Sequence, residues 1–168
     1  CPELESLLTT IPSPPVVVVN LGFQADTITH PLDGFGYLVP STEGGSVLGV
    51  KWTTSIFPTG RAPAGHKLMQ VFLGGSRDAS VAQLDPETQI KIATDELRQT
   101  LGLTQEPVHA RAFTHRSGIP QYTVGHHTRS QQIEGALGRL PGLYLGGTSL
   151  HGVGINACTT SAENLAED

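Results

Sequence analysis

The chain has 168 residues and a formal net charge of −5, with no block of lysine or arginine. This charge pattern argues against nucleic acid as a partner, and no apolar run approaches the roughly 18 residues that cross a membrane as a helix. Hydrophobic residues make up 38% and charged residues 15%, which is typical of a folded chain. Two cysteines at opposite ends, Cys1 and Cys158, indicate a reducing, cytoplasmic setting rather than a disulfide framework. Because residue 1 is Cys and the only methionine is Met69, the sequence is expected to be part of a longer chain.

The first two thirds of the chain predict a largely antiparallel sheet with one long helix. Residues 4–8 are expected to end a helix, and four apolar segments with turn residues between them are predicted as successive strands of a meander: 16–23, 35–40, 47–55 and 67–73. The first of these strands is apolar on both faces, so it is expected to be buried on both sides. A fifth strand is predicted over 108–113.

A helix over 86–101 has the clearest signals in the sequence. Asp85 is suited to the N-cap, Pro86 to the first helical position, and Gly102 to the stop. At helical spacing, one apolar face is formed by Ile90, Ala93, Leu97 and Leu101.

The last part of the chain predicts a helix over 128–138, a short strand over 143–145, a glycine-rich turn and a final helix. In that final helix, Ile155, Cys158, Ala162 and Leu165 are expected to form the buried stripe. The fold class expected is α+β, with a largely antiparallel sheet domain and helix over 1–126 and a helix with a strand-turn-helix over 127–168. A strand-turn-helix of this kind occurs in α/β nucleotide-binding folds, and its partner strands would lie outside this chain.

The glycine-rich turn is the sharpest candidate for a binding site. Four glycines, Gly146, Gly147, Gly152 and Gly154, would let a planar ligand approach the backbone, and no acidic residue occupies the free N–H groups of the helix start. An ordinary tight turn is the alternative. The dinucleotide fingerprint G-x-G-x-x-G and the phosphate-binding G-x-x-x-x-G-K are absent from the sequence, so it lacks the usual means of holding a pyrophosphate.

Other residues give weaker signals. The seven histidines show no metal-binding spacing, so no metal site is predicted, although His151 lies beside the glycine turn. Ser149 lacks the G-x-S-x-G context of a hydrolase nucleophile. Arg61 and Arg77, in glycine-flanked loops, could meet a carboxylate, with solvated arginine as the default. No catalytic side chain is predicted.

An ordered series of short motifs resembles the C-terminal part of FAD-dependent protoporphyrinogen or coproporphyrinogen oxidases, in the flavin amine-oxidase superfamily. The most specific part is Ile-Pro-Gln-Tyr at 119–122, followed by Gly-His at 125–126. The resemblance extends from about residue 8 to residue 163, and its motifs are LDGFGYLVP at 32–40, IFP at 56–58 with RAP at 61–63, FLGGSR at 72–77, GIPQYTVGH at 118–126, LPGLYL at 140–145 and GVGI at 152–155.

The resemblance implies a fold and a cofactor site. It implies that the antiparallel sheet covers a substrate cavity, and that the last strand and helix return to a Rossmann-like FAD-binding domain whose N-terminal half is not in this chain. FAD is the implied cofactor. Val153, Gly154 and Ile155 match positions whose backbone lies against the flavin ring, and the implied cofactor-binding set is completed by Gly152 and Gly147.

The implied reaction is oxidation of protoporphyrinogen IX or coproporphyrinogen III to the porphyrin, with O2 as oxidant and H2O2 released. This chain alone would not be active. The implied location is cytoplasmic, with peripheral contact to the inner face of the cell membrane through a segment outside this chain. The choice between the two porphyrinogens and the oligomeric state are left open.

Three departures from the family pattern bear on flavin binding. Ala157 replaces a usual acidic residue, Ala162 replaces a usual glycine, and the segment at Ser117-Gly118 lacks a usual aromatic residue. Two other functions stay open beside the porphyrinogen oxidase. One is another flavin oxidoreductase of the superfamily, such as an amine oxidase or a carotenoid desaturase. The other is a non-catalytic domain that binds a tetrapyrrole or a partner protein.

Overall fold

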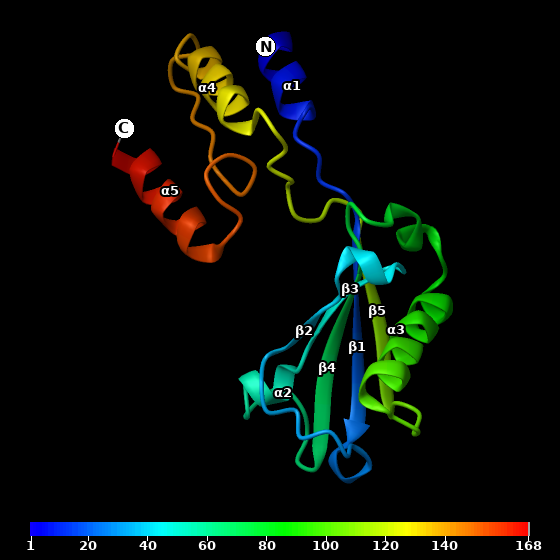
Figure 1. Cartoon of the computed structure of the whole chain (residues 1–168). Helices are drawn as coiled ribbons and strands as arrows, with labels where there is room; N and C mark the ends of the chain where they lie inside the picture. The colour runs from blue at the N-terminus through cyan, green and yellow to red at the C-terminus, as the bar shows by residue number, and fades with distance from the viewer. Residues whose placement is uncertain (168) are drawn as a thin grey trace. The chain divides into compact units, whose positions relative to one another are not determined.

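A computed structural model describes residues 1–167 and has an α+β architecture (Figure 1). Two compact units divide the chain: a sheet unit, Pro15–Arg116, and a helical unit made of Cys1–Pro14 and Ser117–Asp168. The predicted fold class is confirmed as an antiparallel sheet with helices. The sheet unit contains β1 (Val16–Gln24), β2 (Gly36–Leu38), β3 (Val47–Lys51), α2 (Thr53–Ile56), β4 (His66–Gly74), α3 (Pro86–Leu101) and β5 (His109–His115), and the helical unit contains α1 (Pro2–Thr9), α4 (His126–Leu137) and α5 (Ile155–Glu167).

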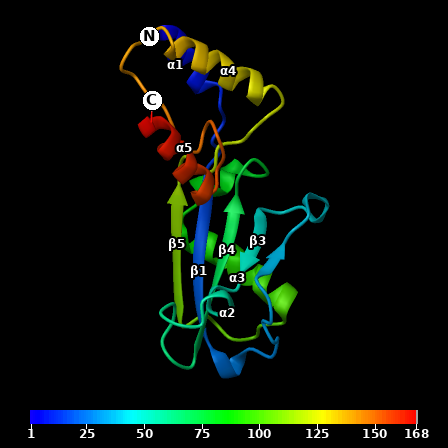
Figure 2. The same ribbon diagram turned by 90° about the vertical axis from the view of Figure 1, so that its left-hand side faces the viewer.

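The sheet has five strands in the order β2-β3-β4-β1-β5, and all neighbours are antiparallel (Figure 2). Strands are confirmed near 16–23, 35–40, 67–73 and 108–113. The predicted simple meander is wrong, because β1 lies between β4 and β5 and only β2, β3 and β4 follow one another. A strand as apolar as β1 is stabilised more by two neighbours than by an edge position, where its backbone groups would meet water.

Helix α3 covers one face of the sheet (Figures 1 and 2). Its predicted signals are confirmed, since the Asp85 carboxylate accepts the Thr88 N–H at 2.9 Å and Gly102 adopts a left-handed conformation with φ of 68°. The core between α3 and the sheet includes Val17, Val19, Leu21, Met69, Val71, Ala93 and Leu97, all fully buried.

The other face of β1 is only partly buried. Val16 and Val18 are half-buried, whereas Val17 and Val19 are fully buried. The prediction of burial on both faces is therefore wrong. An apolar run does not reveal which face a helix covers, and here α3 covers only one.

The predicted strand over 47–55 ends early, at Lys51. Its partner β2 is short, and the last pair is Gly36 with Lys51. The N–H of Trp52 then donates to the Phe35 carbonyl at 2.9 Å, while the carbonyl of Trp52 accepts the N–H of Ile56 at 3.1 Å and starts α2. The backbone therefore leaves the sheet at Trp52, despite the β-forming residues that follow.

The helical unit has its own small core. Helices α1 and α4 lie side by side (Figures 1 and 2), and the residues buried in this cluster are Leu4, Ile11, Ile133, Ala136 and Leu150. The helix predicted over 128–138 is confirmed as α4. The strand predicted over 143–145 is wrong, since this segment has no regular secondary structure. A strand needs a neighbour for its N–H and C=O groups, and the described part of the helical unit contains no strand.

Helix α5 is confirmed, but its predicted buried stripe is wrong. Ile155 is 85% exposed and Ala162 is also exposed, whereas Ser161 is buried and Cys158 and Leu165 are half-buried. The inward face follows the close approach of the preceding loop, because a Cβ at Gly146 would lie 2.5 Å from Leu165. Within residues 1–167, no helix is both long and apolar enough to cross a membrane.

Candidate functional site

The glycine loop, residues 146–154, is held by the side chain of Tyr122. The Tyr122 hydroxyl donates to the Thr148 carbonyl at 2.6 Å and accepts the Gly152 N–H at 2.7 Å. The Tyr122 ring stacks on the His126 ring, with centroids 3.8 Å apart and an interplanar angle of 8°. Two separate segments, 118–126 and 146–154, are therefore joined in one local structure.

The glycine loop leads directly into the N-terminus of α5. No acidic side chain stands in the first turn of that helix, where backbone N–H groups have no intrahelical partner. Gly154 has open space where a Cβ would stand, and Val153 and Ile155 are 47% and 85% exposed. The three backbone positions 153–155 are therefore accessible to a flat, electron-rich ligand.

Two other predicted cofactor residues have a structural reason to be glycine. Gly152 has φ of 125°, and a Cβ there would lie 2.6 Å from that of Ala157. Gly147 has φ of 114°. Both backbone conformations are costly for other residues, so these two glycines are explained by the turn itself. Their contact with a cofactor stays a prediction.

The histidines of the chain are dispersed. His126 begins α4, and its Nδ1 is buried without a hydrogen-bond partner among residues 1–167. His151 lines a hollow of about 810 Å³ in the helical unit, with the end of α4 and one side of α5 among its walls. Among the described residues, no group of three or more His, Cys, Asp or Glu side chains is arranged to hold a metal ion. Ser149 forms no hydrogen bond to a histidine within 1–167.

The two arginines that the sequence could not separate have different surroundings. Arg77 is half-buried and donates at 2.8 Å to the carbonyls of Val47 and Val39, at the ends of β3 and β2. It stabilises the sheet and is not available to a ligand. Arg61 is exposed, and its guanidinium lies 4.9 Å from the centroid of the Phe57 ring.

Arg61 lines a second cleft, which sequence reasoning missed. This sheet cleft has a volume of about 800 Å³ and lies on the face of the sheet opposite α3. Its lining includes Lys51, Arg61, Arg111, His66 and His109. Lys67 also borders the cleft, but it pairs with the buried Phe23, so its side chain leaves the strand on the α3 face. The residues come from four separate parts of the sequence, so only the strand register reveals the cluster.

Comparisons with known proteins identify the family of the chain. The model of the family described as flavin containing amine oxidoreductase matches residues 1–168. A protoporphyrinogen oxidase from Macaca fascicularis is 36% identical over 97% of this chain and 35% of its own length. A coproporphyrinogen III oxidase from Bacillus subtilis is 28% identical over 97% of this chain and 35% of its own length. The chain thus spans about a third of the curated relatives it matches.

A solved structure supports the fold. The crystal structure of a putative protoporphyrinogen oxidase from an Exiguobacterium species superposes with a TM-score of 0.81 at 24% identity, and the match covers 95% of this chain and 35% of that one. At this identity the likeness concerns the fold of the chain. The fold of this chain is therefore one already seen in a solved structure.

Proposed function

The chain belongs to the flavin-containing amine oxidoreductase family, and from that premise we propose that it is part of an FAD-dependent porphyrinogen oxidase. The complete protein would convert protoporphyrinogen IX or coproporphyrinogen III to the porphyrin. The observation that carries the proposal is the similarity, over 97% of the chain, to enzymes named for these two substrates. The order of motifs, with Tyr122 joined to the glycine loop, supports it.

The glycine loop and the start of α5 fit one end of a flavin. Backbone N–H groups at 153–155 would meet its electron-rich edge, because a helix N-terminus stabilises negative charge. When bound, FAD supplies the hydride acceptor, and O2 takes up the electrons and is released as H2O2. Val153 and Ile155 would exclude water beside the ring, and Tyr122 would keep the loop in position. The sequence has no pyrophosphate fingerprint, so the other end of FAD would be held outside this chain.

We assign the substrate cavity to the sheet and the flavin to the later elements. In this proposal residues 1–126 are part of the substrate-binding domain. Residues 127–168 complete a Rossmann-like FAD-binding domain with strands from the rest of the protein. A cytoplasmic location and a peripheral membrane contact stay predictions from the sequence.

The test is aerobic oxidation by the complete protein, purified with FAD. Porphyrin fluorescence should rise when protoporphyrinogen IX or coproporphyrinogen III is added, with H2O2 formed in proportion. A bleached flavin spectrum under anaerobic porphyrinogen would support direct reduction. Oxidation of amines or carotenoids without oxidation of porphyrinogens would overturn the proposal in favour of another member of the superfamily. Tight porphyrin binding with neither FAD nor oxidation would overturn it in favour of a non-catalytic domain.

A further inference from the structure

We propose that the sheet cleft binds the carboxylate side chains of the tetrapyrrole substrate and favours a substrate with four carboxylates over one with two. This inference rests on the proposed function and adds a specificity to it. It depends on three features of the cleft: the charges on its walls, the strand register that spaces them, and the apolar surface beside them.

The charges in the sheet cleft are one-sided. Three of the chain's ten Lys and Arg side chains, Lys51, Arg61 and Arg111, line it, and no Asp or Glu side chain among residues 1–167 does. This is unexpected for a chain with a net charge of −5. Surfaces lined by one sign of charge concentrate ligands of the opposite sign.

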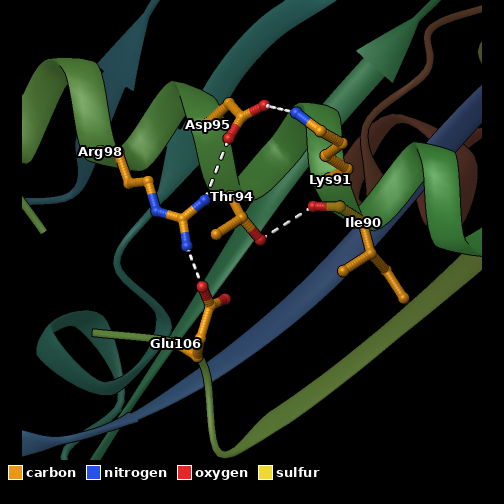
Figure 3. Close-up of polar contacts among 6 residues, drawn as sticks. All are labelled: Ile90, Lys91, Thr94, Asp95, Arg98 and Glu106. Carbon is orange, nitrogen blue, oxygen red and sulfur yellow. Dashed lines mark hydrogen bonds and ion pairs between the residues drawn. The ribbon is translucent and has the colours of Figure 1, made fainter. Parts of the chain in front are cut away.

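The basic side chains on α3 are paired with carboxylates. On α3, Lys91 and Arg98 both contact Asp95, and Arg98 also contacts Glu106 (Figure 3). By contrast, Lys51, Arg61 and Arg111 form no salt bridge with the described residues. A carboxylate entering the cleft would therefore not have to displace a partner from within residues 1–167.

Strand register sets the spacing of the charges. Lys51 pairs with Gln70, Gln70 with Asn20, and Asn20 with Arg111, in one row across β3, β4, β1 and β5. Three inter-strand steps separate the ends of the row, or about 14 Å between the backbones of Lys51 and Arg111. In the middle of the row, the Gln70 amide donates to the Asn20 side-chain oxygen at 2.9 Å. The row therefore has a cation at each end and a neutral polar pair at its centre.

The two arginines of the sheet cleft, Arg61 and Arg111, each lie over an aromatic ring. The Arg111 guanidinium lies 4.8 Å from the centroid of the Phe113 ring, and Arg61 stands over Phe57 in the same way. Such contacts hold a guanidinium in place without neutralising it. Less side-chain freedom is then lost when a carboxylate binds.

An apolar row lies beside the polar row on the same face of the sheet. Phe72 pairs with Val18, and Val18 pairs with Phe113. On the opposite side of the polar row, Gly22 pairs with His109 and Leu68, and a Cβ at Gly22 would lie 3.2 Å from the His109 Cβ, so glycine permits the close approach of β5. Apolar surface next to separated cations matches a ring system that carries acidic arms.

The number and position of the carboxylates on the macrocycle determine how well a porphyrinogen fits the sheet cleft. Protoporphyrinogen IX carries its two propionates on neighbouring rings, at one edge of the macrocycle. Coproporphyrinogen III carries one propionate on every ring. Lys51 and Arg111 are separated by three strand spacings, so a substrate with carboxylates distributed around the ring has more ways to meet both cations than one with two carboxylates at a single edge.

The experiment measures porphyrin binding and turnover by the complete protein. Wild-type protein should bind coproporphyrin III, a tetracarboxylate, at least about tenfold more tightly than mesoporphyrin IX, a dicarboxylate, at low salt, since a charge-assisted hydrogen bond is worth that factor. Arg111→Gln and Lys51→Gln should each raise the Kd for coproporphyrin III about tenfold. Arg111→Lys should retain part of the affinity. The KM for coproporphyrinogen III should rise with the Kd, while kcat changes little.

The matched control is Lys91→Gln, which removes the same charge from the exposed surface of α3. It should leave both Kd values unchanged, because a surface ion pair is worth little. Thermal melting checks that each variant is folded. Equal affinity for the two porphyrins, or unchanged binding in both cleft variants, would overturn the inference even if porphyrinogens are oxidised. Absence of porphyrinogen oxidation by wild-type protein would overturn the proposed function, and the binding of coproporphyrin III by the variants would still decide the role of the cleft.

Discussion

The phenol oxygen of Tyr122 lies 2.7 Å from the backbone nitrogen of Gly152, 30 residues further along the chain. The same oxygen donates to the Thr148 carbonyl, so a single hydroxyl closes a loop of five residues. This contact joins the most specific motif of the sequence to the proposed flavin element. It also gives Tyr122 a role that its sequence neighbours do not reveal.

Tyr122→Phe should loosen the glycine loop while keeping the stack on His126. The lost hydrogen bond should make the ordered glycine loop less stable by about 1 kcal/mol. This corresponds to a roughly fivefold weaker affinity for FAD. The measurement is FAD binding to the complete apoprotein by flavin fluorescence. Tyr144→Phe is the control, because the Tyr144 hydroxyl forms no hydrogen bond to residues 1–167. Equal FAD affinity in the two variants would contradict the role of Tyr122.

Gly154→Ala should separate flavin binding from folding. The added Cβ enters open space, and Gly154 needs no left-handed conformation, so the melting temperature should stay the same. A flavin lying against this backbone would meet the new methyl group, and the FAD content of the purified protein should fall. Gly135→Ala, in the interior of α4 and also in open space, should stabilise the protein by about 0.5–1 kcal/mol and leave FAD content unchanged.

Arg77→Gln should destabilise the sheet unit without a direct effect on a ligand. It removes two hydrogen bonds from a charged group to the carbonyls of Val39 and Val47, with an expected cost of roughly 1.5–3 kcal/mol. Arg77→Lys should recover only part of this, because an ammonium lacks the planar fork. Urea unfolding measures the effect, and Arg61→Gln, at an exposed site, should be close to neutral. A neutral Arg77→Gln would refute the structural role.

Acid should destabilise the sheet unit through three carboxylates. The Ser46 hydroxyl lowers the pKa of Asp78, the Thr88 hydroxyl lowers that of Asp85, and Lys91 lowers that of Asp95. A pKa that is lower in the folded state gives stability that is complete above the unfolded value, ordinarily 3.8, and is lost as pH falls through the folded value.

The melting temperature should therefore change little through these groups between neutral pH and about pH 5, and should fall below pH 4. Asp78→Asn combined with Asp85→Asn should reduce the fall, since asparagine keeps an N-cap oxygen but does not titrate. If the melting temperature of the double variant falls as steeply with acid as that of the wild type, other groups are responsible for the pH dependence.

Local signals predicted the elements that depend on local interactions. Asp85, Pro86 and Gly102 act within one or two turns of α3, so the sequence contains all that defines its ends. The strand expected over 143–145 depends on a neighbour that no local signal supplies. The backbone leaves the sheet at Trp52, despite the β-propensity of the residues after it.

The same distinction applies to the two candidate sites. The glycine loop is continuous in sequence, and its glycines predicted a backbone that bulky residues could not adopt. The sheet cleft unites Lys51, Arg61 and Arg111 only through cross-strand pairing, and Arg61 and Arg77 look alike in sequence because both lie near glycines. Cross-strand register was the missing information.

The helical unit is assembled from two pieces of chain that are separated by the whole sheet unit. Bringing such ends together costs about 4 kcal/mol of loop-closure entropy for roughly 100 intervening residues. The pairing of Val16 with His115, at the first and last residues of β1 and β5, already brings them together. Folding should therefore be hierarchical: the sheet forms first and acts as a template, and the helical unit, with the proposed flavin elements, assembles late. Damage to the sheet should consequently abolish cofactor loading even where no cofactor contact is changed.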